Sequence, residues 1–307
     1  MSKKDNHTKL LDQVKIISDN VNMNIRETLA NQNLDVCDKD PQYGPHTILK
    51  LAYLHYYINI YLSIALSYSK DVVFVDAFGG SGLVMIKDSN YAVLGSALLA
   101  AKPVIMNKSN VGVNKFNFHR IITMDTDKNR VELLNRRYKA LGIKNAEALY
   151  GNSNDIIGTL GSKYGINNNS MVLLFIDPEG MEPKLLNYKK FYSDVKRIDT
   201  IMNYTNGVGR VEPERVKAFI PSFESGDDPD EKLSQYFENT IGKPIGSEVK
   251  IYRIGKSTSY SLVLRVNDTQ SHAKWKDGMA DIEKQISQLD DKSCMYLLQQ
   301  ASGQMHL

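Results

Sequence analysis

The strongest constraint on this chain is a series of short apolar runs that each end in an acidic residue. The clearest are Asp71–Asp76, Arg120–Asp125 and Met171–Asp177, and helical patterns separate them. A nearly continuous apolar run is typical of a parallel strand that is covered on both faces. Strands that alternate with helices indicate a doubly wound α/β sheet, which we predict for this chain.

The remaining elements follow from the same patterns. Further strands are expected at 146–150 and 199–204, an antiparallel pair at 249–254 and 260–266, and helices at 8–30, 48–68, from 96, at 127–141, 213–219, 230–239 and 274–289. The antiparallel pair has a short connection that is typical of a hairpin, and we assign it to the edge of the same sheet. We expect residues 1–45 to form an N-terminal helix and linker, and residues 46–307 one domain with a helical insertion at about 213–245.

Composition sets few limits on function. The 307 residues carry a formal net charge of +3, which permits a nucleic-acid partner without requiring one. Cys37 and Cys294 show no metal-site spacing, and we expect neither a metal nor a disulfide framework. No segment resembles a signal peptide or approaches the ~20 apolar residues of a membrane helix. We therefore expect a cytoplasmic protein with no membrane partner.

A glycine-rich turn, Asp76-Ala77-Phe78-Gly79-Gly80-Ser81-Gly82, follows the first strand. Glycine lets the backbone approach a ligand because it has no Cβ, and a turn at the carboxyl end of a parallel strand lies where α/β sheets bind ligands. The spacing differs from the dinucleotide fingerprint and suits S-adenosylmethionine, with the turn beside the methionine part. The candidate cofactor residues here are Asp76, Phe78, Gly79, Gly80, Ser81 and Gly82. A tight structural turn is the alternative.

The next two strand ends supply candidate contacts for the nucleoside part of this cofactor. Asp125 can accept hydrogen bonds from both ribose hydroxyls, with Thr126 beside it. The alternative is that Asp125 and Asp127 both cap the following helix. The loop after the third strand can read the nitrogens of adenine, or form an ordinary turn, through the polar side chains of Asn152, Ser153 and Asp155.

The fourth strand ends in Asp177-Pro178-Glu179, next to the expected methyl donor. We expect Asp177 to contact the cofactor and to orient or deprotonate the methyl acceptor. Pro178 stiffens the loop and is a candidate substrate contact. Glu179 is a candidate general base or acceptor contact, with a solvated loop acid as the alternative.

The segment beyond the fifth strand and two basic stretches bear on the acceptor. Asn203 is a further catalytic candidate, and Tyr204 and Arg210 are candidate substrate contacts. Arg210 suits an anionic group such as a phosphate, unless it is only a surface arginine. Basic stretches at 108–120 and 184–197 carry aromatic residues, a combination that suits single-stranded nucleic acid, although most such runs are solvated faces.

Taken in order and spacing, these motifs resemble the three-Cys-motif partner (TcmP) proteins. The resemblance covers roughly residues 45–289 and rests on the glycine-rich turn, Gly95-Ser96, Phe175–Gly180, Ile201–Tyr204, His46–Lys50 and Lys274–Met279. It implies a Rossmann-like class I methyltransferase fold in a prokaryotic protein, encoded beside a protein partner of the three-cysteine type. Glu179 stands where the family usually has an aromatic residue. The turn is also similar to that of adenine-N6 DNA methyltransferases, whose Asp-Pro-Pro-Tyr loop this chain lacks.

Two functions follow as hypotheses. The first is methyl transfer from S-adenosylmethionine to a nitrogen or oxygen of a nucleic-acid base or a related nucleotide. The second is a non-catalytic protein that keeps the fold and docks a neighbour-encoded protein. The joint presence of Asp76, Gly80, Gly82, Asp125 and Asp177 favours the enzyme, because a docking platform does not need that set.

Overall fold

The computed structural model describes residues 8–18, 21–106, 116–205, 212–252, 259–267 and 274–302. The helices are α1 (Thr8–Ser18), α2 (Val21–Ala30), α3 (Thr47–Tyr68), α4 (Ser96–Met106), α5 (Lys128–Ala140), α6 (Ser153–Ile156), η3 (Ile157–Thr159), α7 (Leu160–Tyr164), α8 (Leu185–Asp194), α9 (Pro213–Phe219), α10 (Pro229–Gln235), η5 (Tyr236–Ile241), α11 (Lys274–Ile286) and α12 (Asp291–Ala301). The strands are β1 (Gln42–Tyr43), β2 (Val72–Asp76), β3 (Leu83–Ile86), β4 (Ala92–Leu94), β5 (Arg120–Asp125), β6 (Ala146–Tyr150), β7 (Met171–Ile176), β8 (Ile198–Thr205), β9 (Ile245–Tyr252) and β10 (Ser259–Val266).

A sheet of seven strands in the order β6-β5-β2-β7-β8-β10-β9 forms the centre of the described part of the chain. The strands from β6 to β8 pair in parallel. β10 pairs antiparallel with both β8 and β9, so the hairpin belongs to the same sheet. The predicted fold class is confirmed: a Rossmann-like, doubly wound and mostly parallel sheet that ends in an antiparallel hairpin.

Two hydrophobic cores cover the two faces of this sheet. Side chains of β2 alternate between them, with Val72 and Phe74 in the first core and Val73 and Val75 in the second. Residues of α1, α3, α4, α5, α11 and α12 join the first core, and residues of α8, α9, α10 and η5 join the second. Burial on both faces explains why these strands are apolar almost throughout.

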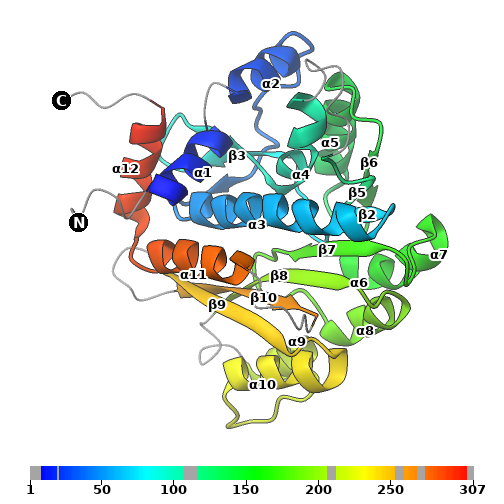
Figure 1. The fold of residues 1–307 in the computed structure, drawn as a ribbon. Coiled ribbons are helices and arrows are strands. Elements are labelled where there is room, and N and C mark those ends of the chain that lie inside the picture. The colour runs from blue at the N-terminus through cyan, green and yellow to red at the C-terminus, as the bar shows by residue number, and fades with distance from the viewer. Residues whose placement is uncertain are drawn as a thin grey trace.

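Helix α3 is the main support of the first face and crosses the sheet between α1 and α11 (Figure 1). Most of its residues are buried, and the others, which include Asn59, Ser63 and Ser67, form one stripe along its later turns. Lys50 is the one Asp, Glu, Lys or Arg among its 22 residues, and it is buried. A lysine in that environment needs a partner, because an unpaired buried charge is costly.

A small second sheet, in the order β1-β3-β4, was not predicted from the sequence. β3 and β4 form a hairpin directly after the glycine-rich turn, and the N–H of Gly95 closes its base on the carbonyl of Gly82 at 2.8 Å. β1 pairs in parallel with β3, with Gln42 opposite Met85. The segment expected to be a plain linker is therefore held beside the turn.

Other differences concern the two ends of the described chain. The expected N-terminal helix appears as α1 and α2, which both contribute to the first core. α12 was not predicted and packs beside α1 (Figure 1). No described helix combines the length and the apolar character needed to cross a membrane. The division of the chain near residue 45 stays a prediction, and α9, α10 and η5 occupy the range predicted for the helical insertion.

Candidate functional site

Polar side chains from four adjacent strands meet at one edge of the sheet. Asp76 lies opposite Thr123 of β5 and Phe175 of β7, and Asp125 and Asp177 come two residues further along these strands. Side chains alternate along a strand with a period of two, so the three carboxylates belong to the same face. By the same register, which pairs Phe175 with Ile201, Asn203 of β8 lies on that face too. This is the face that α3 covers.

The glycine-rich turn has the backbone conformations that its glycines permit. Gly80 has φ +58° and Gly82 has φ +93°. A Cβ on Gly82 would lie 2.8 Å from Leu134 Cδ1, and a Cβ on Gly79 would lie 2.7 Å from Thr123 Cβ. A Cβ on Gly80 would meet nothing within 4 Å. Gly79 and Gly82 thus pack the turn against its own fold, whereas Gly80 borders open space where a ligand can approach its backbone.

Asp76 is the most perturbed of the three acids. It is fully buried, its Oδ1 accepts the N–H of Phe78 at 3.0 Å, and its Oδ2 has no hydrogen-bond partner among the described residues. Burial raises the pKa of Asp76 to about 7, and the negative charges of Asp177 and Asp125 add to this; the nearby Ser96 hydroxyl and the Phe78 N–H oppose it. A buried carboxylate of this kind favours a cation beside it.

Asp125 and Asp127 accept hydrogen bonds from different parts of the backbone. Asp127 is the N-cap of α5 and accepts the N–H groups of Asn129 at 2.8 Å and Arg130 at 3.3 Å. Asp125 instead accepts the N–H of Gly80 at 3.1 Å and that of Asp127 at 2.7 Å. Partial burial raises the pKa of Asp125, and these backbone bonds oppose the rise. Only Asp127 therefore caps the helix, and Asp125 joins the strand end to the glycine-rich turn.

Asp177 forms an ion pair that the sequence did not reveal. Lys50 Nζ lies 2.8 Å from Asp177 Oδ1 and 2.6 Å from Oδ2, and both side chains are mostly buried. Asn203 Nδ2 donates to the same Oδ1 at 2.9 Å, while Asn203 Oδ1 is buried without a described partner. The structure brings two of the catalytic candidates together and adds a lysine to them.

The segment before α3 covers this group. The hydroxyl of Tyr43 donates to Glu179 Oε1 at 2.9 Å, and Lys50 Nζ lies 5.8 Å from the centre of the Tyr43 ring, within cation–π range. Burial, together with the charge of Glu179, raises the pKa of the Tyr43 hydroxyl, which therefore stays a donor. Glu179 itself is exposed on its loop.

A fully buried ion pair between Asp40 and Arg137 anchors the same segment. Arg137 donates to Asp40 Oδ2 at 2.8 Å, to the carbonyl oxygens of Leu34 and Asp35 at 2.9 Å, and to the carbonyl oxygen of Ser81 at 3.0 Å. The hydroxyl of Ser81 donates to the carboxylate of Asp40. Ser81 of the glycine-rich turn is thus tied to the N-terminal segment and is fully buried.

These residues enclose a small cavity. Tyr43, Lys50, Phe78, Gly80 and Asp177 line a space of about 40 Å³. One water molecule has a share of about 30 Å³ in the liquid. A nucleoside-sized ligand therefore enters only if the side chains over the turn, Tyr43 and Lys50 above all, move aside.

The residues predicted to contact adenine lie next to Asp125, because the N–H of Gly151 donates to the Asp125 carbonyl at 3.0 Å. Asn152 is exposed and caps α6 by accepting the N–H of Asn154 at 2.9 Å. Ser153 is buried, and its Oγ accepts the hydroxyl of Tyr188 at 3.0 Å. Asp155 and Thr126 are exposed. Their predicted contacts with adenine and ribose stay predictions.

The candidate substrate contacts are more scattered. Pro178 is buried beside Asp177. Tyr204 lies on the opposite face of the sheet from Asn203, in the second core, where its ring stacks on Phe219 at 5.8 Å and 8°. Arg210 lies outside the described residues, as does the part of the first basic stretch from 108 to 115. The acid cluster and Tyr204 do not share a pocket wall.

No protein-family model matches the chain, and no curated protein matches its sequence. Among solved structures, a protein from Legionella pneumophila is similar over 76% of this chain and 90% of its own, with a TM-score of 0.46 and 12% identity. A putative O-methyltransferase from Klebsiella pneumoniae is similar over 81% and 91%, with a TM-score of 0.40 and 13% identity. Human methyltransferase-like protein 13, in complex with SAH, is similar over 80% and 92%, with a TM-score of 0.41 and 12% identity. All three likenesses are remote, and the strand order above defines the fold independently of them.

Proposed function

We propose that this protein is an S-adenosylmethionine-dependent methyltransferase. The observation that carries the proposal is the buried carboxylate of Asp76, whose Oδ2 accepts no hydrogen bond from a described residue and which lies beside a glycine-rich turn that opens at Gly80. A sulfonium cation would stabilise the ionised form of this acid, whose pKa burial raises to about 7. The acids on the neighbouring strands give the rest of the cofactor polar partners.

Each part of the cofactor would contact different residues. The methionine part would lie along the Gly80 turn, and Asp125 would accept the ribose hydroxyls with the oxygen lone pairs that its two backbone bonds leave free. Asn152 and Asp155 are exposed next to that strand end and would contact adenine. When bound, the cofactor supplies a methyl group that is activated by the positive sulfur.

Asp177 and Asn203 would hold the methyl acceptor. Once Lys50 releases its carboxylate, Asp177 can accept a hydrogen bond or a proton from an acceptor nitrogen or oxygen, and Asn203 fixes the orientation of that carboxylate at 2.9 Å. Fixed orientation of an acceptor toward the methyl group contributes several kcal/mol to rate. Tyr43 and Lys50 would exclude water from the site when they close over it.

For the acceptor we propose a nucleic-acid base or a related nucleotide. The Asp177-Pro178 pair is similar to the start of the loop that grips amino groups in amino-group methyltransferases. The exposed lysines of the second basic stretch, Lys184 and Lys189, offer positive charge to a phosphate backbone. Glu179 in place of an aromatic residue removes one means of stacking a base.

Titration calorimetry with S-adenosylmethionine tests the proposal. We expect Asp125→Ala to weaken binding by about 1–3 kcal/mol through the loss of two ribose hydrogen bonds. Asp155→Ala, with an exposed side chain near the same strand end, is the milder comparison. No binding heat and no thermal shift at millimolar ligand would refute the proposal.

The alternative is a non-catalytic protein that docks a partner, and the TcmP resemblance implies that this partner would be encoded by a neighbouring gene. The 40 Å³ cavity and the Lys50–Asp177 ion pair favour this alternative. The cavity is too small for the cofactor, and the charge of Asp177 is already compensated by Lys50. Co-purification with a neighbour-encoded protein, together with absent cofactor binding, would support this alternative. Cofactor binding that depends on Asp125 would exclude it.

A further inference from the structure

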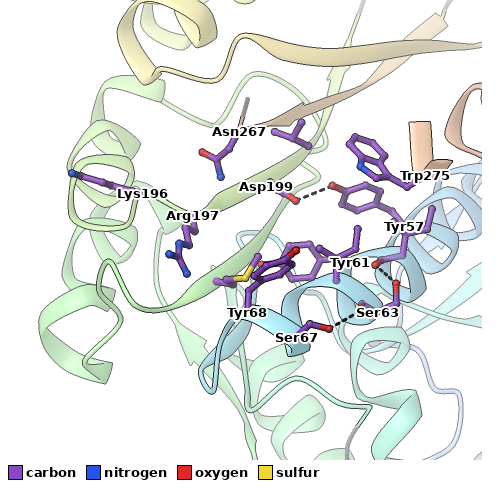
Figure 2. Close-up of a pocket in the computed structure, with 14 residues that line it drawn as sticks. Tyr57, Tyr61, Ser63, Ser67, Tyr68, Lys196, Arg197, Asp199, Asn267 and Trp275 are labelled. Carbon is purple, nitrogen blue, oxygen red and sulfur yellow. Dashed lines mark hydrogen bonds between the residues drawn. The ribbon is translucent and has the colours of Figure 1, made fainter. Parts of the chain in front are cut away.

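A second and larger cavity lies at the opposite edge of the sheet (Figure 2). Its volume is about 810 Å³, within the range of small-molecule pockets. The second half of α3, the first residues of β7 and β8, the last residue of β10 and the start of α11 form its walls. Because β7 runs from Met171 at this cavity to the residue before Asp177, the two sites are separated by the length of a six-residue strand, roughly 20 Å.

The walls of this cavity are rich in aromatic rings. Tyr57 and Trp275 meet edge to face with ring centres 6.3 Å apart, and Tyr61 lies 6.3 Å from Tyr57. Tyr68 lies at the mouth, where it is 72% exposed (Figure 2). Rings of this kind bind a flat, apolar ligand by stacking and edge contacts.

The inner part of the cavity offers polar groups that suit the edge of such a ligand. Asp199 lies deep in the protein with part of its surface facing the cavity, and it accepts the hydroxyl of Tyr57 at 2.9 Å. The hydroxyl of Tyr61 is buried and has no hydrogen-bond partner among the described residues. The amide oxygen of Asn267 accepts a hydrogen bond from the ammonium of Lys243, and its side-chain amide also carries two N–H donors. Hydrogen-bond acceptors and donors therefore line the inner part of the cavity, next to the aromatic rings.

Two exposed cations, Lys196 and Arg197, lie beside the cavity, and Figure 2 shows that Arg197 is nearer to the rings while the Lys196 side chain extends away from them. Neither side chain forms an ion pair with a described residue, whereas Lys190 of the preceding helix is paired with Asp194. Arg197 suits an anionic oxygen because its guanidinium presents a planar fork of donors. The cavity thus combines aromatic side chains, polar groups in its inner part and positively charged side chains near its opening.

We propose that this cavity binds a nucleoside monophosphate, with the base against the aromatic side chains of the wall and the phosphate at Arg197. A nucleobase has a flat face and a polar edge, and its phosphate is an anion, so one ligand uses all three features of the cavity. Asp199 and Asn267 face the edge of the base, and the Tyr61 hydroxyl, which bonds to no described residue, gains a partner. An apolar ligand would give the buried Tyr61 hydroxyl no hydrogen-bond partner, and an isolated anion would make no use of the rings. The site is separate from the one proposed for S-adenosylmethionine.

The test uses Trp275, the single tryptophan of the chain, as an intrinsic fluorescent reporter. The full-length protein is titrated with AMP and with GMP, and ribose 5-phosphate and a short single-stranded RNA serve as comparison ligands. We expect a saturable change in Trp275 emission with at least one mononucleotide. Arg197→Ala should weaken that binding at least about tenfold, as loss of a charge-assisted contact implies. Tyr68→Ala should weaken it at least about fivefold through loss of stacking.

Matched variants separate this site from the first one. Arg215→Ala removes an exposed arginine of α9 and should leave the nucleotide affinity unchanged. Asp125→Ala should weaken S-adenosylmethionine binding without changing the Trp275 response to a nucleotide. The proposal is overturned if millimolar mononucleotide leaves the emission unchanged, if ribose 5-phosphate binds as well as the nucleotide, or if only the RNA strand binds. It is equally overturned if Asp125→Ala, rather than Arg197→Ala, abolishes the response.

Discussion

Replacement of Asp76 by asparagine should change the pH dependence of stability. Burial raises the pKa of this acid from 3.8 to about 7. Between these two values the folded protein holds a proton that the unfolded chain has lost, so the stability of the wild type falls as pH rises. The difference is about three pH units, and each corresponds to about 1.36 kcal/mol, which gives a loss of about 4 kcal/mol between pH 4 and pH 8.

Asp76→Asn lacks this ionisation while nearly keeping the shape of the side chain. We expect the variant to gain about 4 kcal/mol relative to the wild type on going from pH 4 to pH 8, with most of the gain between pH 4 and pH 7. The free energy of unfolding is measured by urea denaturation at a series of pH values. Asp38→Asn, at an exposed acid, is the control and should follow the wild type within about 0.5 kcal/mol. Parallel pH profiles for Asp76→Asn and the wild type would refute the reasoning.

The same acid predicts a pH dependence of cofactor binding. A sulfonium beside Asp76 lowers its pKa in the complex, so binding of S-adenosylmethionine should strengthen by up to about tenfold per pH unit as pH rises toward 7. S-adenosylhomocysteine has a neutral sulfur and should lack this trend. Calorimetry at several pH values measures both, and equal trends for the two ligands would contradict the role of Asp76.

Three further predictions concern residues around the turn. Arg137→Met removes the charge partner of the buried Asp40 carboxylate and should lower the free energy of unfolding by about 3–5 kcal/mol. The control Arg136→Met, at an exposed neighbour, should lower it by less than about 0.5 kcal/mol. Similar losses for the two variants in urea denaturation would contradict the role of the ion pair. Gly82→Ala should destabilise more than Gly80→Ala, by at least about 1 kcal/mol, because only the Cβ at 82 meets a neighbouring side chain; the reverse order in the same assay would refute the packing argument. Lys50→Met removes a positive charge that would repel the sulfonium at the proposed site. In calorimetry, the affinity for S-adenosylmethionine relative to that for S-adenosylhomocysteine should rise at least about fivefold. An unchanged affinity ratio would show that Lys50 lies away from the sulfonium.

The sequence predicted the large sheet because its strands carry a strong local signal. β5 and β6 match their predicted ranges, and β5 does so because a strand that is buried on both faces is mostly apolar. The small sheet carries a weaker signal, because its strands have only two to four residues. β1 has two residues and pairs with β3, about forty residues later in the chain, so only the tertiary contact defines it as a strand.

The candidate site was only partly predictable for a related reason. Asp76, Asp125 and Asp177 could be grouped because parallel strand ends share one edge of a sheet. Lys50, Asp40 and Arg137 reach the site from other layers, and their pairing depends on how the chain packs. Lys50 did leave one sequence signal, as the single charged residue in an otherwise apolar helix. Tyr43 left none, because it lies in a polar stretch of turn formers.

Helix α3 touches both ends of the sheet. Lys50 near its start faces the acid cluster, while Tyr57 and Tyr61 on its later turns border the second cavity. The distance between Lys50 and Tyr61 along the helix axis is about 16 Å. Both residues belong to the same continuous helix, so we expect the turns between them to move together. A ligand that displaces Lys50 and a ligand that packs on Tyr61 therefore both contact helix α3. If both sites are occupied, each ligand must change the affinity of the other by the same factor.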